Sequence, residues 1–408
     1  MPVIKGIHIA DLHLGTSFRY LTGQGIEELR RNDFVSNFNV AIDEALKRGV
    51  DLFIIAGDVF HRAEPTAKDF IAFTHGLGRL INNGIDVVVI AGNHDKPKSS
   101  KAKTLLEGLQ ALGLPKFHYI HTVSREPKPL IIEKGGVKVG IAPLPYVDPR
   151  LVKDFDVPYQ AFIRDKVGKL KDHPAISDAD FKVLVAHLMI DKAKYLEIFP
   201  YFKEEPKVSL SDIHEGFFDY IALGHIHTPQ KVGSRAYYSG SIERINFAEK
   251  DEDKGFIYFE LGRDGGLYVE EIRLKCRPMK ELSVNIEGTP NPLTALLDVI
   301  RSEVFEKGSL LKLKVIGEPE GIKTIKSSID KVGNALMNKG IAGFYIDFIT
   351  LGRELTPPPP PGGEGIGKSE IKELFIEFVK SYLRGRGDEL INEVVSRGLK
   401  ILQEEGLI

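Results

Sequence analysis

The sequence predicts an α/β protein in which helices lie on the faces of a β-sheet. Two observations predict this fold class: apolar runs of four to six residues recur through residue 223, and longer helical patterns lie between them. We expect strands at residues 5–10, 52–56, 87–91, 138–142, 183–186 and 220–223, and helices at 26–48, 66–82, 101–112 and 159–170. Beyond residue 223 the pattern changes to strands at 236–238, 255–260 and 267–273, separated by turns.

The chain of 408 residues is longer than one hydrophobic core usually serves, so we expect several folding units. A second pattern begins near Arg277, with strands at residues 282–286, 311–316 and 344–349 and helices at 293–305 and 322–339. Five prolines followed by two glycines then predict a stiff linker. The expected segments are a main domain at 1–276, a small α/β domain at 277–352, the linker at 353–368 and a helical tail at 369–408.

Composition and charge limit where the protein can be located in the cell and what kind of partner it can bind. No apolar run approaches the ~20 residues that a helix needs to cross a bilayer, so we expect no membrane contact. Cys276 is the only cysteine, which excludes an intrachain disulfide and favours a cytoplasmic location. The net charge of −2 does not indicate a nucleic-acid-binding protein, so such a surface would have to be local. The best candidate is a run of lysines, for which a solvated loop is the alternative: Lys96, Lys98, Lys101 and Lys103.

Five of the predicted strands are each followed directly by residues that bind metals. In chain order these residues are Asp11 and His13, Asp58, Asn93, His187, and the pair His225 and His227. Because ligands bind outside the carboxyl ends of strands in α/β sheets, we expect these side chains to converge. A single Asp-x-His or His-x-His motif would more often consist of ordinary surface residues or a core histidine that bind no metal. Five such motifs in order, each after an apolar strand, are not explained by that alternative. Glycines at 57, 92 and 224 would let the backbone turn sharply beside the ligands.

The types of ligand indicate which metals are bound. Imidazoles mixed with carboxylates favour Mn, Fe or Zn over Mg or Ca, which prefer oxygen ligands. Seven ligands can serve two ions only if one is shared, and Asp58 can bridge through its two oxygens. Two ions ~3.5–4 Å apart can hold the attacking and leaving oxygens of a phosphoryl displacement. The pattern therefore predicts a two-metal phosphoesterase.

The order of these motifs resembles that of the calcineurin-like metallophosphoesterases over about residues 4–260. Within that superfamily, Gly57-Asp-Val-Phe-His61 and Ser239-Gly-Ser-Ile-Glu-Arg244, followed by Glu249 and Lys254, resemble DNA double-strand-break repair nucleases. These are the meiotic-recombination-eleven family and its bacterial relative SbcD. The resemblance implies a β-sandwich flanked by helices, a DNA-binding capping domain after Arg277, and Mn-dependent 3'-5' double-strand exonuclease and single-strand endonuclease activity.

The resemblance also implies a role for each site residue. Asp11, His13, Asp58 and His227 would hold one Mn²⁺ ion, and Asp58, Asn93, His187 and His225 the other, with Fe, Zn or Mg as substitutes. His94 would stabilise or protonate the leaving group, and Asp95 would hold the His94 ring in one tautomer. His61 would contact the phosphate in a second position, which the family associates with exonuclease action.

Two partners besides DNA are implied. The helices at 66–82 and 101–112 would form a homodimer, although they could equally well only cover the sheet. In the tail, apolar residues at helical spacing include Leu374, Phe375, Phe378 and Val379. We expect this face to bind the coiled-coil ABC-type repair ATPase of the related systems. The alternatives are folding back on the small domain and pairing with a second copy.

Other functions of the same superfamily compete with this interpretation. A protein phosphatase would need two arginines around its phosphate, and only Arg62 stands at such a position, because the second is Ala91. A small-molecule or cyclic-nucleotide phosphodiesterase would not need the capping domain and the tail. A non-enzymatic scaffold would not need all seven ligands and His94. Outside the motifs, we interpret His8 as a core residue and Cys276 as a core or linker residue.

Overall fold

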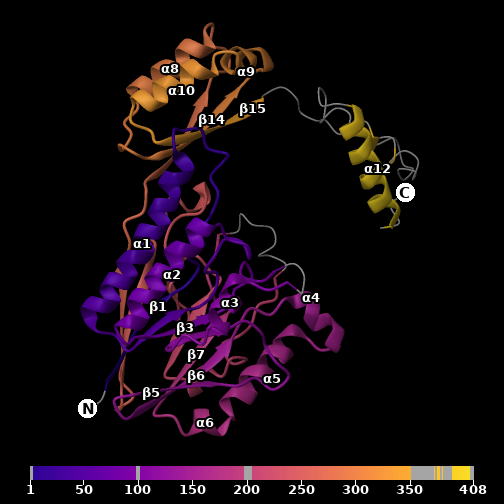
Figure 1. Ribbon diagram of the computed structural model, residues 1–408. Helices are drawn as coiled ribbons and strands as arrows, with labels where there is room; N and C mark the ends of the chain where they lie inside the picture. The colour runs from indigo at the N-terminus through magenta and orange to yellow at the C-terminus, as the bar shows by residue number, and fades with distance from the viewer. Residues whose placement is uncertain are drawn as a thin grey trace. The chain divides into compact units, whose positions relative to one another are not determined.

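The computed structural model describes residues 3–97, 102–196, 205–350, 372, 375, 376, 379 and 388–404. It divides into two compact units, Met1–Ile349 and Thr350–Ile408. The first unit contains three β-sheets and most of the helices (Figure 1).

The first sheet has six strands in the order β12-β11-β1-β2-β3-β4. In chain order they are β1 (Val3–Ile9), β2 (Leu52–Ile55), β3 (Asp86–Ile90), β4 (Phe117–Ile120), β11 (Gly255–Gly262) and β12 (Leu267–Arg273). Strands β1 to β4 are parallel, and β11 and β12 extend the sheet in antiparallel fashion. Helices α1 (Ile26–Arg48), α2 (Ala67–Asn82) and α3 (Leu105–Ala111) pack on its outer face, with Phe38, Phe73 and Leu106 in the shared core.

The second sheet also has six strands, in the order β5-β6-β7-β8-β10-β9. They are β5 (Leu130–Lys134), β6 (Val137–Leu144), β7 (Phe181–His187), β8 (Tyr220–Gly224), β9 (Gln230–Lys231) and β10 (Ala236–Tyr238). Helix α5 (Tyr159–Lys171) packs on its outer face, with Ile163 and Leu170 in the core. Short helices lie nearby: α4 (Pro149–Val152), η1 (Lys153–Phe155), α6 (Pro174–Ser177), η2 (Glu215–Phe217) and η3 (Phe247–Glu249).

The two sheets pack face to face, so the strands are buried on both sides. In β2, Leu52 and Ile54 face the second sheet, whereas Phe53 and Ile55 face the helices. Burial on both sides explains why these strands are continuous apolar runs instead of alternating patterns. The α/β class is confirmed, but the strands form a sandwich of two sheets, as the family resemblance implied, and not the one sheet that their alternation predicted. The sequence pattern also missed β4, β5 and the two-residue β9.

Helix ends follow local side-chain chemistry. Thr66 caps α2 by accepting a hydrogen bond from the Asp69 N–H, so the helix begins one residue after the predicted start. Helix α3 starts four residues later than predicted, because Thr104 and Glu107 form a capping box at its N-terminus. Helix α1 ends at Gly49, which adopts a left-handed conformation at φ 59°.

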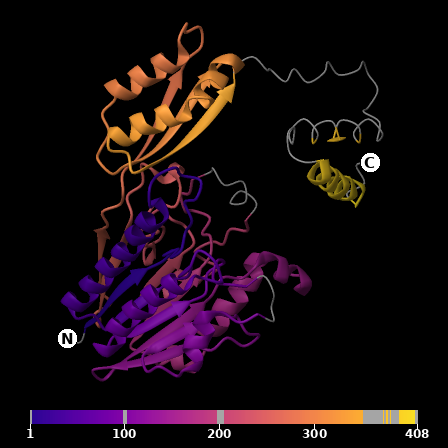
Figure 2. The same cartoon turned by 45° about the horizontal axis from the view of Figure 1, so that its top comes forward.

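The third sheet, in the order β13-β14-β15, belongs to the small C-terminal part of the first unit. Its strands are β13 (Met279–Asn285), β14 (Leu310–Gly317) and β15 (Gly343–Thr350). Helices α8 (Pro292–Ser302), α9 (Pro319–Lys326) and α10 (Ile329–Asn338) cover one face and enclose a separate core (Figure 2). The predicted helix at 322–339 is therefore two helices, which break at Ser327 and Ser328. The domain boundary at 276 stays a prediction.

This small part is joined to the main sheets by polar contacts. Thr22 and Phe344 exchange two backbone hydrogen bonds of 2.7 and 2.9 Å. The Arg277 guanidinium donates to both oxygens of Asp33 in α1 at 2.6 Å. A bidentate pair of this kind fixes orientation as well as distance, so the junction is held at two separate points.

The second unit contains α12 (Asp388–Glu404). The ring of Phe375 packs against this helix, because a Cβ on Gly398 would lie only 2.1 Å from it. Val379 is also buried. The other two expected partner contacts, Leu374 and Phe378, lie outside the described residues. Among the described residues there is no helix with the length and apolar character of a membrane span.

The buried histidine His8 joins the two sheets and predicts an acid sensitivity. Its Nδ1 lies 2.9 Å from the Tyr220 hydroxyl and its Nε2 lies 3.1 Å from the Leu223 carbonyl. Burial lowers the pKa of His8 to about 3, although the Leu223 carbonyl opposes the shift. The unfolded chain therefore binds a proton below pH 6.5 that the folded chain does not, and stability falls between pH 6.5 and pH 3.

We predict that His8→Gln makes the free energy of unfolding less dependent on pH in this window. The slope should fall by up to about 1.4 kcal/mol per pH unit, the contribution of one proton. Urea unfolding of both proteins in EDTA at pH 6.5, 6.0 and 5.5 would measure it. Parallel slopes for the two proteins would show that His8 is not the group responsible.

Candidate metal centre

The candidate ligands lie at the carboxyl ends of strands from both large sheets. The first sheet supplies Asp11 and His13 after β1, Asp58 after β2 and Asn93 after β3. The second sheet supplies His187 at the end of β7 and His225 and His227 after β8. The sequence predicted this convergence from strand ends alone, and the structure brings all seven side chains together.

One group of ligand atoms surrounds His13. Its Nε2 lies 3.0 Å from the Nε2 of His227 and 3.8 Å from Oδ2 of Asp58. Ligand atoms of Asp11, His13 and His227 all lie within 4.8 Å of one another. With Asp58, these are the residues of the first predicted ligand set, and their binding of an ion stays a prediction.

A second group surrounds the side-chain oxygen of Asn93. This oxygen lies 3.1 Å from Nε2 of His187 and 3.1 Å from Nδ1 of His225. Oδ2 of Asp58 lies 3.6 Å from the same His187 nitrogen. Asp58 therefore stands between the two groups, which is the position that a bridging ligand requires.

The charges in this site suit bound cations. Burial raises the pKa of Asp58 well above its usual value, and the neighbouring Asp95 and Asp11 raise it further. Burial lowers the pKa of His13 and of His187 well below the usual value, and other imidazoles add to both shifts. Within the part of the chain that the structure describes, neither Asp11 nor Asp58 forms an ion pair with lysine or arginine. Clustered carboxylates and neutral imidazoles without a countercharge are what divalent transition metals bind, so the residues fit two ions.

The backbone at the ligands is strained. Asp11, His13, Asp58 and His225 have positive φ angles of 51°, 44°, 54° and 98°. Such conformations cost about 1–3 kcal/mol each and persist only where the surroundings enforce them. The Asp11 N–H donates to the Gly57 carbonyl at 3.1 Å, and the His225 N–H donates to the Asp11 carboxylate at 3.0 Å. The ligand loops therefore hold one another in place.

The three glycines beside the ligands have two different functions. Gly57 has φ 100°, so the predicted sharp turn is correct there. Gly92 and Gly224 have no positive φ, and the reason for glycine is space. A Cβ on Gly92 would lie 2.0 Å from Oδ1 of Asp58, and one on Gly224 would lie 2.0 Å from the Ala56 carbonyl. Any side chain at 92 would displace Asp58.

His94 lies beside the first ligand group, with its ring 4.8 Å from that of His13. Its Nδ1 is 2.9 Å from the His61 carbonyl, and the ring of His61 stacks on it at 5.2 Å. Asp95 was expected to orient the His94 ring, but its carboxylate accepts hydrogen bonds from the N–H groups of Val59, Phe60 and Gly92. The interpretation of Asp95 is therefore corrected: it joins two ligand loops, and the His61 carbonyl orients His94.

The four lysines of the proposed nucleic-acid surface are not equivalent. Lys96 donates to the Tyr146 carbonyl, and the Tyr146 ring lies 6.1 Å from that of His187 and 5.9 Å from that of His225. Burial lowers the pKa of Lys96. Lys103 is largely exposed and pairs with Glu107 at 2.9 Å, whereas Lys98 and Lys101 lie outside the described residues. Of the two described lysines of this run, Lys96 is the one beside the ligands.

Sequence reasoning missed the groups that hold the outer nitrogens of the ligand histidines. His227 Nδ1 lies 3.1 Å from Glu249, His225 Nε2 lies 2.8 Å from Glu205, and His187 Nδ1 lies 2.8 Å from the Ala56 carbonyl. Metal-binding histidines usually have such partners. Glu249 stood in a recognised motif without a role, whereas nothing in the sequence singled out Glu205.

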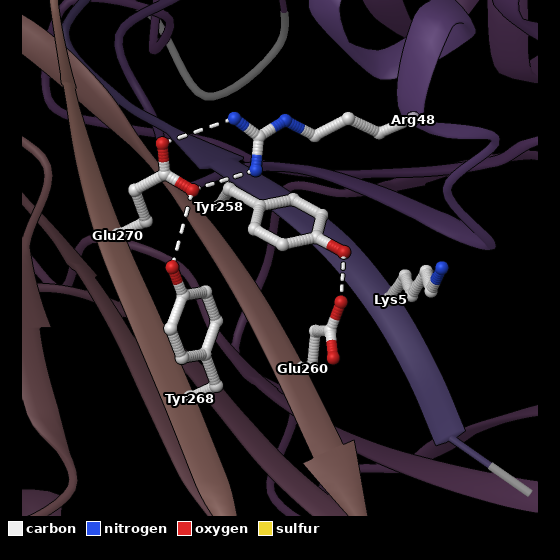
Figure 3. A pocket seen from close by; sticks show the side chains of 6 residues that line it. All are labelled: Lys5, Arg48, Tyr258, Glu260, Tyr268 and Glu270. Carbon is white, nitrogen blue, oxygen red and sulfur yellow. Dashed lines mark hydrogen bonds and ion pairs between the residues drawn. The ribbon is translucent and has the colours of Figure 1, made fainter.

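A separate pocket of about 430 Å³ lies on the first sheet (Figure 3). It is lined by Lys5, Arg48, Tyr258, Glu260, Tyr268 and Glu270. Arg48 donates to both oxygens of Glu270 at 2.7 and 3.0 Å, and Tyr258 donates to Glu260. Most of its polar groups thus bind one another, and it contains none of the predicted ligands.

Comparison with known proteins gives an independent result. Residues 4–229, more than half of the chain, match the family model described as calcineurin-like phosphoesterase. The chain is 27% identical over 288 residues to a protein of Aeropyrum pernix named DNA double-strand break repair protein Mre11, covering 69% of this chain and 64% of that one. Proteins of the same name from Methanopyrus kandleri and Archaeoglobus fulgidus are 28% and 26% identical.

These matches differ in extent. The match to the Methanopyrus protein covers 68% of this chain and 58% of that protein, so the chain spans less than two thirds of the first two relatives. The match to the Archaeoglobus protein covers 99% of this chain and 87% of that protein.

Gly92→Ala should weaken metal binding by about 10–100-fold, because the new Cβ would force the ligand Asp58 to move. Titration calorimetry with Mn²⁺ would measure this. Gly78→Ala is the matched control, because a Cβ there meets nothing within 4 Å. If the Gly92→Ala and Gly78→Ala proteins bind Mn²⁺ with equal affinity, the close packing of Gly92 against Asp58 is not needed for metal binding.

Proposed function

The chain belongs to the calcineurin-like phosphoesterase family, and from this premise we propose that it is a two-metal nuclease that processes DNA ends at double-strand breaks. The observation that carries the proposal is the position of the Asp58 carboxylate between the two groups of ligand atoms. It lies near His13 of the first group and His187 of the second, and it accepts a hydrogen bond from the His94 N–H. The printed function of the relatives supports DNA as the substrate. We propose Mn²⁺ as the metal, 3'-5' exonuclease and single-strand endonuclease activities, and a cytoplasmic location.

The proposed mechanism assigns each group a task. Bound ions would neutralise the phosphate and lower the pKa of a nearby water. The Nδ1–H of His94 donates to the His61 carbonyl, so its Nε2 is the atom that would first have to take up a proton and then pass it to the leaving oxygen. Asp95 keeps the loops of Asp58 and Asn93 in register through backbone hydrogen bonds. His61, stacked on His94, would position the phosphate for exonuclease action.

We further propose that the chain acts in an assembly. Large apolar residues are exposed on α2 (Ile71, 63%), on α3 (Leu105, 44%) and directly after α3 (Leu112, 69%), and these helices are the proposed homodimer surface. The small domain of β13 to β15 would bind DNA as a cap over the site. The tail would bind a coiled-coil ABC-type ATPase, with Phe375 packed against α12.

Asp58→Ala should abolish cleavage, with a loss of at least about 100-fold, because removing the shared carboxylate disturbs both ligand groups. Labelled linear duplex and single-stranded DNA would be incubated with Mn²⁺, with Mg²⁺ and with EDTA. Asp43→Ala serves as the control, since Asp43 lies on the surface of α1, where it pairs with Arg79. Cleavage by the Asp58→Ala protein at the rate of the control would exclude the two-metal mechanism.

A chain shortened to end at Pro357 should keep cleavage of short single-stranded DNA but should no longer co-elute with the ATPase on a sizing column. Val394→Glu in the full-length chain should weaken co-elution as well, because Val394 is 37% exposed on α12. Val304→Glu, at the 81% exposed Val304 of the small domain, is the matched control. If the shortened chain still co-elutes, the docking surface lies elsewhere.

A further inference from the structure

Behind the ligand His227 lies a buried network of charged side chains. The His227 Nδ1–H donates to Oε1 of Glu249 at 3.1 Å, and the ammonium of Lys254 lies 2.8 Å from Oε2 of Glu249. Lys254 also donates to the His227 carbonyl at 3.1 Å and to Glu252 at 2.9 Å. Both Glu249 and Lys254 are 1% exposed.

Every hydrogen-bond donor of the Lys254 ammonium has an acceptor in this network, and this fixes the geometry of the network. An ammonium group has three N–H donors, and Lys254 has three acceptors: the His227 carbonyl, Glu249 and Glu252. Buried ion pairs are poor sources of stability, because desolvation offsets their attraction, so their presence needs another explanation. Lys254 binds both the backbone carbonyl of His227 and the Glu249 carboxylate, which in turn accepts a hydrogen bond from the His227 ring. The Nδ1 of the His227 ring therefore carries the proton. Its Nε2 faces Nε2 of His13 at a distance of 3.0 Å.

The other ligand histidines are held differently. His187 uses a backbone carbonyl, and His225 uses Glu205, which is 11% exposed at the edge of the site. Among the described residues, Glu205 has no ion pair with a lysine or arginine comparable to that of Glu249. The buried Nδ1 of His13, the fourth ligand histidine, has no hydrogen-bond partner among the described residues. Within the described part of the chain, His227 is thus the only one of the four ligand histidines whose partner carboxylate is clamped by a buried cation.

We propose that Glu249 and Lys254 are positioning residues for one metal ion of the pair, the ion held by Asp11, His13, Asp58 and His227. They touch neither the ion nor the substrate, and they act by fixing the His227 ring. This inference rests on the two-metal proposal. It gives a role to the Glu249 and Lys254 positions of the sequence motif, which the proposed reaction leaves unexplained.

The test counts bound ions instead of measuring activity. The full-length protein, stripped with EDTA, would be titrated calorimetrically with Mn²⁺, and the metal content would be measured after dialysis. The unaltered protein should bind two ions. Glu249→Gln should lower the affinity of one ion by about 10–100-fold, the usual effect of losing such a partner, and leave the other unchanged. At a Mn²⁺ concentration that just saturates the unaltered protein, the count should fall from two to about one.

Two further variants sharpen the test. Glu270→Gln is the matched control, because Glu270 is also a carboxylate bound by a cation, but it lies in the pocket of Figure 3 and should leave both ions in place. Glu249→Gln with Lys254→Met removes both buried charges together and should show the same loss of one ion, so it carries the test if the single variant does not fold. Either variant binding two ions with unchanged affinity would overturn the inference. An unaltered protein that binds no Mn²⁺ would instead refute the two-metal proposal on which it rests.

Discussion

The carboxylate of Asp58 has to face two groups of imidazoles at once, and much of the surrounding structure serves that requirement. Its Oδ2 lies 3.8 Å from His13 and 3.6 Å from His187, while its Oδ1 accepts the His94 N–H at 2.8 Å. The residue reaches this position through a left-handed backbone conformation at φ 54°. Gly92 packs directly against the Asp58 carboxylate, so residue 92 has no room for a side chain. A small displacement of this one carboxylate would therefore change both ligand groups together.

Asp58 can stand there because two sheets end at the same place. Ligands on β1, β2 and β3 belong to one sheet and those on β7 and β8 to the other, so the site exists only while the sheets stay in register. His8 contributes directly to that register, since it bonds from β1 to Tyr220 and Leu223 of β8. The cost is a histidine that must stay neutral in the core. His8 thus links β1 and β8, two strands that both lead into ligand residues.

The junction with the small domain is held by a second buried charge network. Arg30 in α1 is fully buried; it donates to Asp33 at 2.7 Å and to the Arg244 carbonyl at 2.7 Å. Asp33 also accepts hydrogen bonds from Nε and Nη2 of Arg277, which precedes β13 of the small domain. The recognised motif that ends at Arg244 therefore has a structural explanation: it lies where the large domain, the chain crossover and the small domain meet. Its one arginine, Arg244, donates to the Arg277 carbonyl at 3.2 Å and so contributes to this junction.

The amino-acid pattern alone determined the fold class, the order of the ligand motifs and their convergence, because each depends on short stretches: an apolar strand and the residues that follow it. Tertiary structure decided what those stretches could not. Two sheets instead of one, the strained φ angles at His13 and His225, the change in the role of Asp95, and Glu205 as a histidine partner all depend on which distant segments pack together. Local periodicity reports which side of a strand is apolar. It carries no information about the partner that covers that side, and in this protein the partner decides the geometry of the metal centre.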